Sequence, residues 1–304
     1  MRSTMDKPVP PRYLPYGEGG WRLSMGLLSL DPAEWIEADA DYPAQLALKE
    51  ELLATRHDAV FQALPGTEAA QAEVLALLAH HLPARFPDRF RRAGNALHSL
   101  ADDRRIALDD SGRAPLDIAG RLVQEDLCLM RAGPEGYELV AASLCFPASW
   151  RLADKIGRPM LAIHAPVPGY AEKLGKPVDR FFGFLKADKP VWRFNWSLPD
   201  NDRLFSPTGH GRAAHDPEIT AENIGQRVFI RVERQTLRRL PASGDILFTI
   251  RTYLDRLDRL EPFPPLARAL LGAVGDLTPG MTRYKSIQPF RAALEEYLTR
   301  VGGA

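Results

Sequence analysis

The first third of the chain carries apolar residues at helical spacing. They recur in this way from Pro43 to about Leu64, and again from about Glu68 to Leu82. Such a stripe is typical of a helix that packs one face against a core. Because Pro65-Gly66 disfavours a continuous helix between the two runs, we predict two separate helices. A short helix is expected before them, beginning at Asp31 with a capping carboxylate and a first-turn proline.

Further along the chain apolar and polar residues alternate, which is typical of strands with one buried face. Turn residues join four of these strands into two hairpins, and the strand at 191–198 is separate from them. The expected strands lie at 123–129, 137–146, 191–198, 228–237 and 246–253, and the expected helices at 115–122, 150–156, 170–174, 178–185, 252–260, 265–274 and 289–301. The pattern therefore predicts an α+β fold, an antiparallel β-sheet with added N- and C-terminal helices.

His164 follows the apolar run 160–163 and precedes Pro166 and Pro168. We expect the run to be a strand that ends at the histidine, and the prolines to stiffen the backbone beyond it. A ring held in this way suits an iron ligand or a proton-transfer group. The alternative is a core histidine that is satisfied by one backbone carbonyl. The residues around His164 leave both interpretations open.

The stretch Trp192-Arg193-Phe194-Asn195-Trp196 combines two indoles, a guanidinium and an amide. In a strand the three aromatic rings share one face, and Arg193 and Asn195 share the other. Taken alone, this stretch is explained by a tryptophan-rich core strand with an ion-paired arginine. The loop predicted at 199–223 contains two histidines, His210 and His215, whose spacing matches no motif for metal binding or catalysis.

Arg231 and Glu233 share one face of the strand predicted at 228–237, whereas Arg234 follows the apolar stripe of the other face. A buried guanidinium is costly unless it meets an anion, a carboxylate or a ligand. A cross-strand charge ladder with Arg251 explains Arg231 and Glu233 without any ligand. That ladder does not account for Arg234.

Composition narrows the classes of function. Of the 304 residues 45% are hydrophobic and 26% are charged, which is enough for a large core. Lys plus Arg and Asp plus Glu both total 39, so the formal net charge is zero. The chain therefore lacks the broad positive field that non-specific binding to nucleic acid or to an anionic membrane needs. We expect a small substrate or a discrete protein partner.

Cys128 and Cys145 are the only cysteines, which excludes a disulfide framework and any all-cysteine metal site. Residues 1–20 are rich in proline and lack the apolar core of a secretory signal, and no later stretch suits a membrane span. We expect a cytoplasmic protein with a flexible segment over residues 1–20. Phosphate loops, nucleophile elbows, HExxH and CxxC motifs do not occur in the sequence.

Several short motifs occur in a fixed order and together resemble the haem-dependent oxidative N-demethylase family over about Trp21 to Tyr253. They are Trp150 with Lys155-Ile156-Gly157, Ile163-His164-Ala165-Pro166-Val167-Pro168, Arg193-Phe194-Asn195-Trp196, and Arg231-Val232-Glu233-Arg234-Gln235-Thr236-Leu237 with Arg239-Leu240-Pro241. The resemblance implies a PAS-like antiparallel sheet with added helices. It also implies a single haem-binding domain over residues 21–304 and haem b as the cofactor.

The resemblance further implies oxidative demethylation of a small secondary amine, such as dimethylamine, with dioxygen as oxidant and formaldehyde as a product. Electrons would come from NADPH through a flavin and iron–sulfur reductase made as a separate chain. Two other functions are compatible with the sequence. One is a non-catalytic haem-binding sensor or carrier on a PAS-like fold, and the other is a structural α+β protein without a cofactor.

Carried over to this sequence, the resemblance makes His164 the candidate axial ligand of the haem iron. The ring nitrogen that does not bind iron should then donate to a carbonyl or a carboxylate. Cys145 is the rival ligand, because thiolate-ligated haem also activates dioxygen. The residues around Cys145, however, are typical of an ordinary core strand.

Arg234, or failing it Arg231, is expected to hydrogen-bond bound dioxygen or a haem propionate. Glu233 is a candidate for contact with the amine, since a cationic amine favours a carboxylate or an aromatic face. The expected cofactor-binding set is completed by Arg193, Trp196 and Tyr170.

Overall fold

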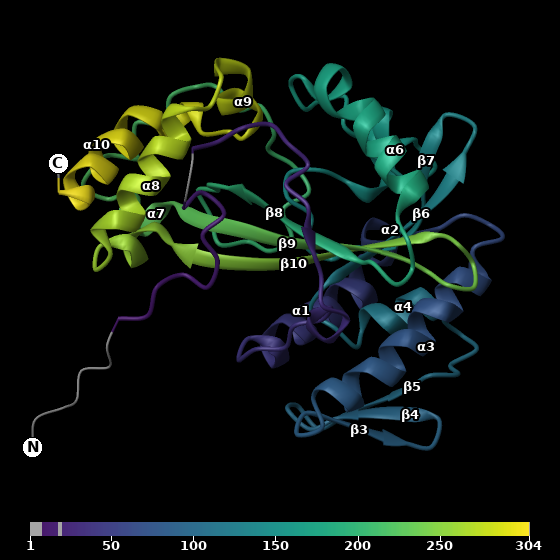
Figure 1. Cartoon of the computed structure of the whole chain (residues 1–304). Helices are drawn as coiled ribbons and strands as arrows, with labels where there is room; N and C mark the ends of the chain where they lie inside the picture. The colour runs from purple at the N-terminus through teal and green to yellow at the C-terminus, as the bar shows by residue number, and fades with distance from the viewer. Residues whose placement is uncertain (1–7, 18–19, 304) are drawn as a thin grey trace, which may run out of the picture.

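The computed structural model describes residues 8–17 and 20–303. Its centre is an antiparallel sheet with the strand order β1-β8-β9-β10-β6-β7-β2 (Figure 1). The strands are β1 (Leu28–Ser29), β2 (Phe61–Ala63), β6 (Asp126–Gly133), β7 (Gly136–Ser143), β8 (Val191–Ser197), β9 (Phe229–Arg239) and β10 (Ile246–Arg256). Helices pack on this sheet, so the predicted α+β class is confirmed.

Helices from three parts of the chain surround the sheet (Figure 1). The N-terminal group is α1 (Tyr42–Thr55), α2 (His57–Val60), α3 (Glu68–Arg85) and α4 (Pro115–Gly120). The chain between α3 and α4 forms a second, three-stranded sheet of β3 (Phe90–Ala93), β4 (Ala96–Ser99) and β5 (Arg104–Ala107). The middle group is α5 (Met160–Ile163), a π-helical turn at Ala171–Gly175, and α6 (Lys176–Phe184). The C-terminal group is α7 (Ile224–Arg227), α8 (Pro264–Gly275), α9 (Pro279–Tyr284) and α10 (Arg291–Gly302).

Alternation along β6 separates the two faces of the sheet. Leu127 and Leu129 belong to the core cluster formed with the N-terminal helices. Cys128 and Met130 belong to a second cluster, which contains Phe182 of α6. The C-terminal helices bury a third cluster against the first half of β9. The face under α5 and α6 is therefore chemically distinct from the face under α1 and α3.

Two predicted helices were wrong at their ends. The helix expected to reach Leu64 stops at Thr55, and Phe61–Ala63 pairs with β7 instead. The apolar residues around Phe61 suit a strand as well as a helix, and pairing with a free sheet edge decides between the two. The helix expected from residue 252 is strand up to Arg256, because the register with β9 extends to the pair Arg256↔Phe229.

The run before His164 is a helix and not the expected strand. In α5 the N–H of Ile163 donates to the Pro159 carbonyl at 2.9 Å, and the N–H of His164 donates to the Met160 carbonyl at 3.1 Å. A proline just before the first turn favours this helical start. The helix expected at 150–156 is reduced to a 3-10 turn at Leu152–Asp154.

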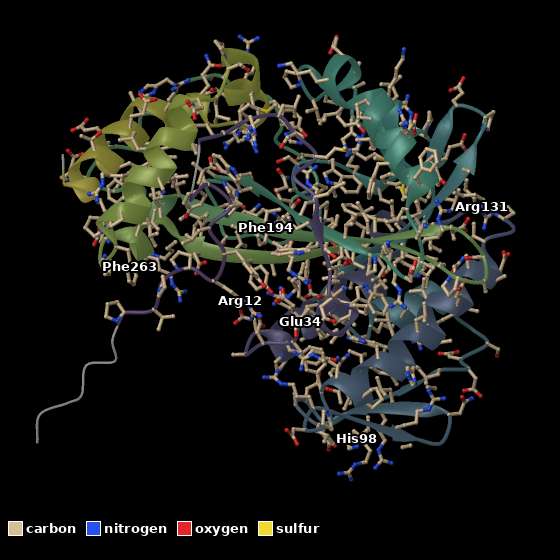
Figure 2. All side chains as sticks on the ribbon, in the orientation of Figure 1. Arg12, Glu34, His98, Arg131, Phe194 and Phe263 are labelled. Atoms are coloured by element: carbon tan, nitrogen blue, oxygen red, sulfur yellow. The ribbon has the colours of Figure 1, made fainter. Side chains whose placement is uncertain are left out.

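The N-terminal segment packs on the sheet where the structure describes it. Tyr16 is 2% exposed, and its ring lies 5.9 Å from that of Trp196. The Tyr13 ring lies 4.7 Å from that of Phe194 in β8, which Figure 2 labels. Flexibility of residues 1–20 stays a prediction, and residues 1–7 and 18–19 lie outside the described part. Over the described ranges, no helix combines the length and apolar character that crossing a bilayer requires.

Candidate functional site

A cavity of about 900 Å³ lies on the face of the sheet that α5 and α6 cover. Its floor consists of side chains that alternation turns to the same side of four neighbouring strands. Register aligns Arg193 with Gln235 and Gln235 with Ile250, so the floor is continuous from β8 to β10. The floor residues are Arg193, Asn195, Glu233, Gln235, Leu237, Phe248, Ile250, Cys128 and Met130.

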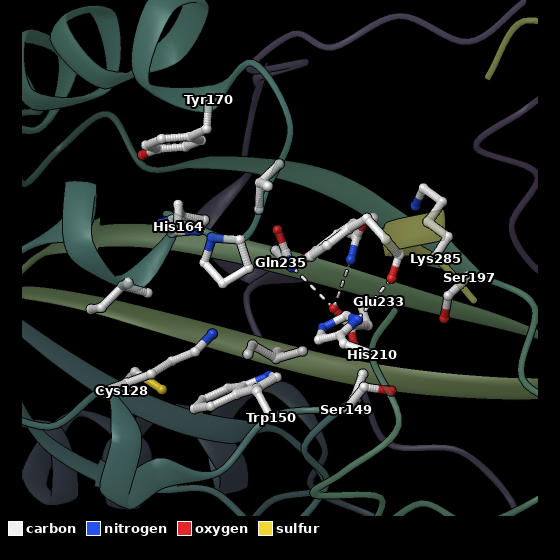
Figure 3. Close-up of a pocket in the computed structure, with 18 of the residues that line it drawn as sticks. Cys128, Ser149, Trp150, His164, Tyr170, Ser197, His210, Glu233, Gln235 and Lys285 are labelled. Atoms are coloured by element: carbon white, nitrogen blue, oxygen red, sulfur yellow. Dashed lines mark hydrogen bonds between the residues drawn. The ribbon is translucent and has the colours of Figure 1, made fainter. Parts of the chain in front are cut away.

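Segments without long regular structure complete the walls. They include residues 148–158 with Lys155, the α5 region with His164 and Tyr170, the loop after β8 with His210, and the segment after α9 with Lys285. Figure 3 shows His164 and Tyr170 at one end of the view, and Glu233, His210 and Lys285 at the other. We call the part of the cavity with Glu233, His210 and Lys285 its polar end.

His164 is held by its own helical turn and by Tyr170. Nδ1 lies 2.9 Å from the Met160 carbonyl oxygen, and since a carbonyl only accepts, Nδ1 carries the proton. The ring stacks on Tyr170 with centroids 4.4 Å apart and an angle of 11°. Burial lowers the pKa of His164 to about 4. The neutral ring thus has its lone pair on Nε2, and the expected carbonyl partner is Met160.

Three half-buried cations line the cavity, and they contact no carboxylate within ion-pair distance in the described part of the chain. The Lys155 amine lies 3.9 Å from the centre of the Trp150 ring. The Lys285 amine donates to the Trp196 carbonyl. Burial lowers the pKa of each lysine to about 8 and also lowers the pKa of Arg193. Because these half-buried cations lack a carboxylate partner among the described residues, the cavity favours a ligand that carries an anionic group.

Glu233 supplies the negative charge of the cavity floor and is 7% exposed. It accepts hydrogen bonds from Arg231 at 3.2 Å, Asn195 at 3.3 Å and Gln235 at 3.2 Å. A carboxylate offers about four acceptor positions. One position is therefore left for a donor that enters the cavity.

Five of the residues expected from the sequence meet around this cavity. They are His164, Tyr170, Arg193, Trp196 and Glu233. The Tyr170 hydroxyl is buried and has no hydrogen-bond partner in the described part of the chain. The Trp196 ring packs against Tyr16, and the Lys285 amine lies 4.8 Å from its centre.

Arg231 and Arg234, the expected contacts for dioxygen or a propionate, are not among the lining residues. Arg234 points to the opposite face, where it donates to the carbonyls of Glu34 at 2.5 Å and Trp35 at 3.2 Å. Arg231 donates to the Phe146 carbonyl at 2.6 Å and to the Glu233 carboxylate at 3.2 Å. Both guanidiniums find their partners within the protein, and the placement does not support the role that the sequence suggested for them.

The rival ligand Cys145 lies in another cluster, with Phe146 and Leu53. Burial raises its pKa to about 12, so the thiol is protonated near neutral pH. Cys128 does line the cavity, although burial raises its pKa as well. Sequence reasoning missed His210 and Lys285, because neither belongs to a strand or a motif that indicates its position.

One family model matches residues 26–295, and its description is haem-dependent oxidative N-demethylase, alpha subunit-like. The match covers every strand of the cavity floor and the segment that carries His164. This chain belongs to the haem-dependent oxidative N-demethylase, alpha subunit-like family.

Proposed function

We propose that this chain binds haem b through His164 and oxidatively demethylates a small secondary amine of the dimethylamine type, releasing formaldehyde. Electrons would come from NADPH through a separate flavin and iron–sulfur reductase. Membership of the family supports haem dependence and oxidative N-demethylation. The observation that carries the proposal for this chain is the fixed, neutral imidazole of His164 in the cavity wall.

The donor set fits an iron-bound haem. Histidines that bind metals usually donate their second ring N–H to a carbonyl or a carboxylate, which fixes the tautomer. His164 shows this arrangement with the Met160 carbonyl at 2.9 Å. Stacking on Tyr170 further restrains the ring plane. Nε2 is therefore the nitrogen that would hold the iron.

The size and charge of the cavity fit the rest of the cofactor. Pockets for small molecules and cofactors are usually about 300–1,000 Å³, and this cavity is about 900 Å³. The apolar part of its floor, with Leu237, Phe248 and Ile250, suits a flat hydrophobic macrocycle. Lys155 and Arg193 are the cations that would hold the two propionates, because both are half-buried without a carboxylate partner.

Bound haem supplies the dioxygen chemistry, and the protein supplies binding, orientation and protection from water. The open acceptor position of Glu233 would receive an N–H of the amine and so direct the carbon next to nitrogen. The apolar residues of the floor would keep water from the reacting carbon. A PAS-like relationship of the sheet, a single domain over residues 21–304 and a cytoplasmic location also belong to the proposal.

A single-turnover experiment tests the function without the reductase. The haem-loaded protein is reduced with dithionite without oxygen, freed of excess reductant, and mixed with dimethylamine in oxygenated buffer. We expect formaldehyde and methylamine in equal amounts, up to about one per two haems, because the oxidation needs two electrons and each ferrous haem supplies one. Glu233→Gln should lower the yield, since it weakens contact with the amine. A protein that binds haem but forms no formaldehyde would be a sensor or carrier, which would contradict the proposal.

A further inference from the structure

The polar end of the cavity contains a second histidine, His210, which the loop after β8 places at the rim. Its side chain is exposed, whereas Glu233 on the floor is 7% exposed. His210 therefore lies between bulk water and the cavity whose floor carries Glu233. None of the roles described so far uses this ring.

The position of the His210 ring is fixed by the segment after α9. Nδ1 lies 2.9 Å from the Tyr284 carbonyl oxygen, so it is Nδ1 that carries the proton. The ring also stacks on Tyr284, with centroids 4.4 Å apart and an angle of 19°. Nε2 is left with the lone pair, and within the described residues it has no hydrogen-bond partner. The ring is thus prepared to accept a proton.

Groups around the cavity shift the pKa of His210 in both directions. Partial burial lowers the pKa of His210, and the charges of Lys155 and Lys285 lower it further. The hydrogen bond to the Tyr284 carbonyl and the charge of Glu233 raise it. The balance lowers the pKa, so the ring is neutral near pH 7 and can act as a base.

The amine substrate needs such a base. An alkylammonium group such as that of lysine has a pKa of about 10.4, so a dialkylamine arrives at neutral pH as a cation. Oxidation at the carbon next to nitrogen is easier for the free amine, whose lone pair stabilises the positive charge that develops there. Lys285, at the same end of the cavity, also disfavours a second cation beside Glu233.

We propose that His210 takes the proton from the substrate ammonium at the rim of the cavity and passes it to bulk water. The N–H bond breaks, its electron pair stays on nitrogen, and the proton moves to Nε2 of His210. The free amine keeps its other N–H for Glu233. This inference rests on the proposed demethylation and adds the proton-transfer step that must precede it.

His215 offers a matched control. Its Nδ1 also contacts a backbone carbonyl, that of Pro289 at 3.0 Å, but His215 is not among the lining residues of the cavity. Wild type, His210→Gln and His215→Gln are compared in the single-turnover reaction between pH 6 and pH 9, at several concentrations of dimethylamine. The rate of formaldehyde formation and the amine concentration for half-maximal yield are measured.

We expect His210→Gln to react about a hundredfold more slowly than wild type near pH 7. Its rate should rise with pH as the free amine becomes more abundant, until it approaches the wild-type rate. The half-maximal concentration should change little, because the histidine moves the proton and does not hold the amine. His215→Gln should match wild type throughout.

A wild-type pH profile in His210→Gln would overturn this inference while leaving the demethylation intact, since formaldehyde would still form. A loss of rate in His210→Gln that is equal at every pH would also overturn it, because it would indicate a structural role. Failure of the wild-type protein to form formaldehyde would instead refute the proposed function and the inference with it.

Discussion

The buried Arg231 allows a sharp test of whether the arginines of β9 are structural. Its side chain is 2% exposed. It donates to the carbonyls of Phe146 at 2.6 Å and Leu204 at 3.3 Å, to the Thr252 hydroxyl at 3.2 Å, and to Glu233 at 3.2 Å. Arg231→Met keeps much of the volume and removes all of these donors. We expect the variant to be much less stable than wild type.

The size of the effect follows from the groups left behind. Removing one partner of a buried ion pair costs about 3–5 kcal/mol, and leaving a buried acceptor unsatisfied costs about 1–3 kcal/mol. Glu233 keeps Asn195 and Gln235 as donors and faces the cavity, so the free-energy cost of losing its ion-pair partner is reduced. We therefore expect a loss of about 3–4 kcal/mol in the free energy of unfolding.

Urea unfolding followed by circular dichroism measures this loss. Arg256→Met is the matched control, because Arg256 is an exposed arginine of the neighbouring strand and pairs with Asp258. The control should unfold at nearly the wild-type urea concentration. A loss below about 1 kcal/mol for Arg231→Met, which is the range of an exposed pair, would refute the structural role and restore Arg231 as a candidate ligand contact.

Two further predictions concern the cavity and the pH dependence of stability. Lys155→Ala and Arg193→Met should each weaken haem affinity about tenfold or more, since a charge-assisted hydrogen bond contributes about 1.5–3 kcal/mol. Haem transfer titrations measure the affinity, and Arg151→Ala is the control because Arg151 pairs with Asp154. Unchanged affinity in both variants would contradict the propionate assignment. Burial lowers the pKa of His81 to about 4, below its unfolded value of about 6.5, so His81 stabilises the fold above pH 6.5 and this contribution is lost as the pH falls toward 4. The urea midpoint of His81→Gln should therefore depend less on pH over that interval, and an equal dependence would show that His81 does not titrate there.

The parts of the fold that the sequence predicted are those with a long, regular period. The hairpin of β9 and β10 follows from sustained alternation, and α3 and α10 follow from apolar stripes between clear start and stop residues. Short elements were harder to predict. Met160–Ile163 is one helical turn, and β3 to β5 are short strands that expose arginines, so tertiary contacts and not local pattern decide their conformation.

The site shows the same division. Alternation placed Arg193 and Glu233 on their faces correctly, and register then brought both to one floor. The partners of Arg231 and Arg234 are carbonyls far away along the chain, Phe146 and Glu34, which no local pattern reveals. His210 and Lys285 approach the cavity through irregular segments, so only the folded chain shows that they belong to it.

The electron paramagnetic resonance and Soret spectra of haem-loaded His164→Ala test the central claim most directly. His215→Ala serves as the control, because His215 also contacts a backbone carbonyl but does not line the cavity. We predict that the ferric wild type and the control show the same spectrum of an imidazole-ligated haem, and that His164→Ala loses it or fails to retain haem. An unchanged spectrum with full haem content in His164→Ala would contradict the assignment of His164 as the iron ligand.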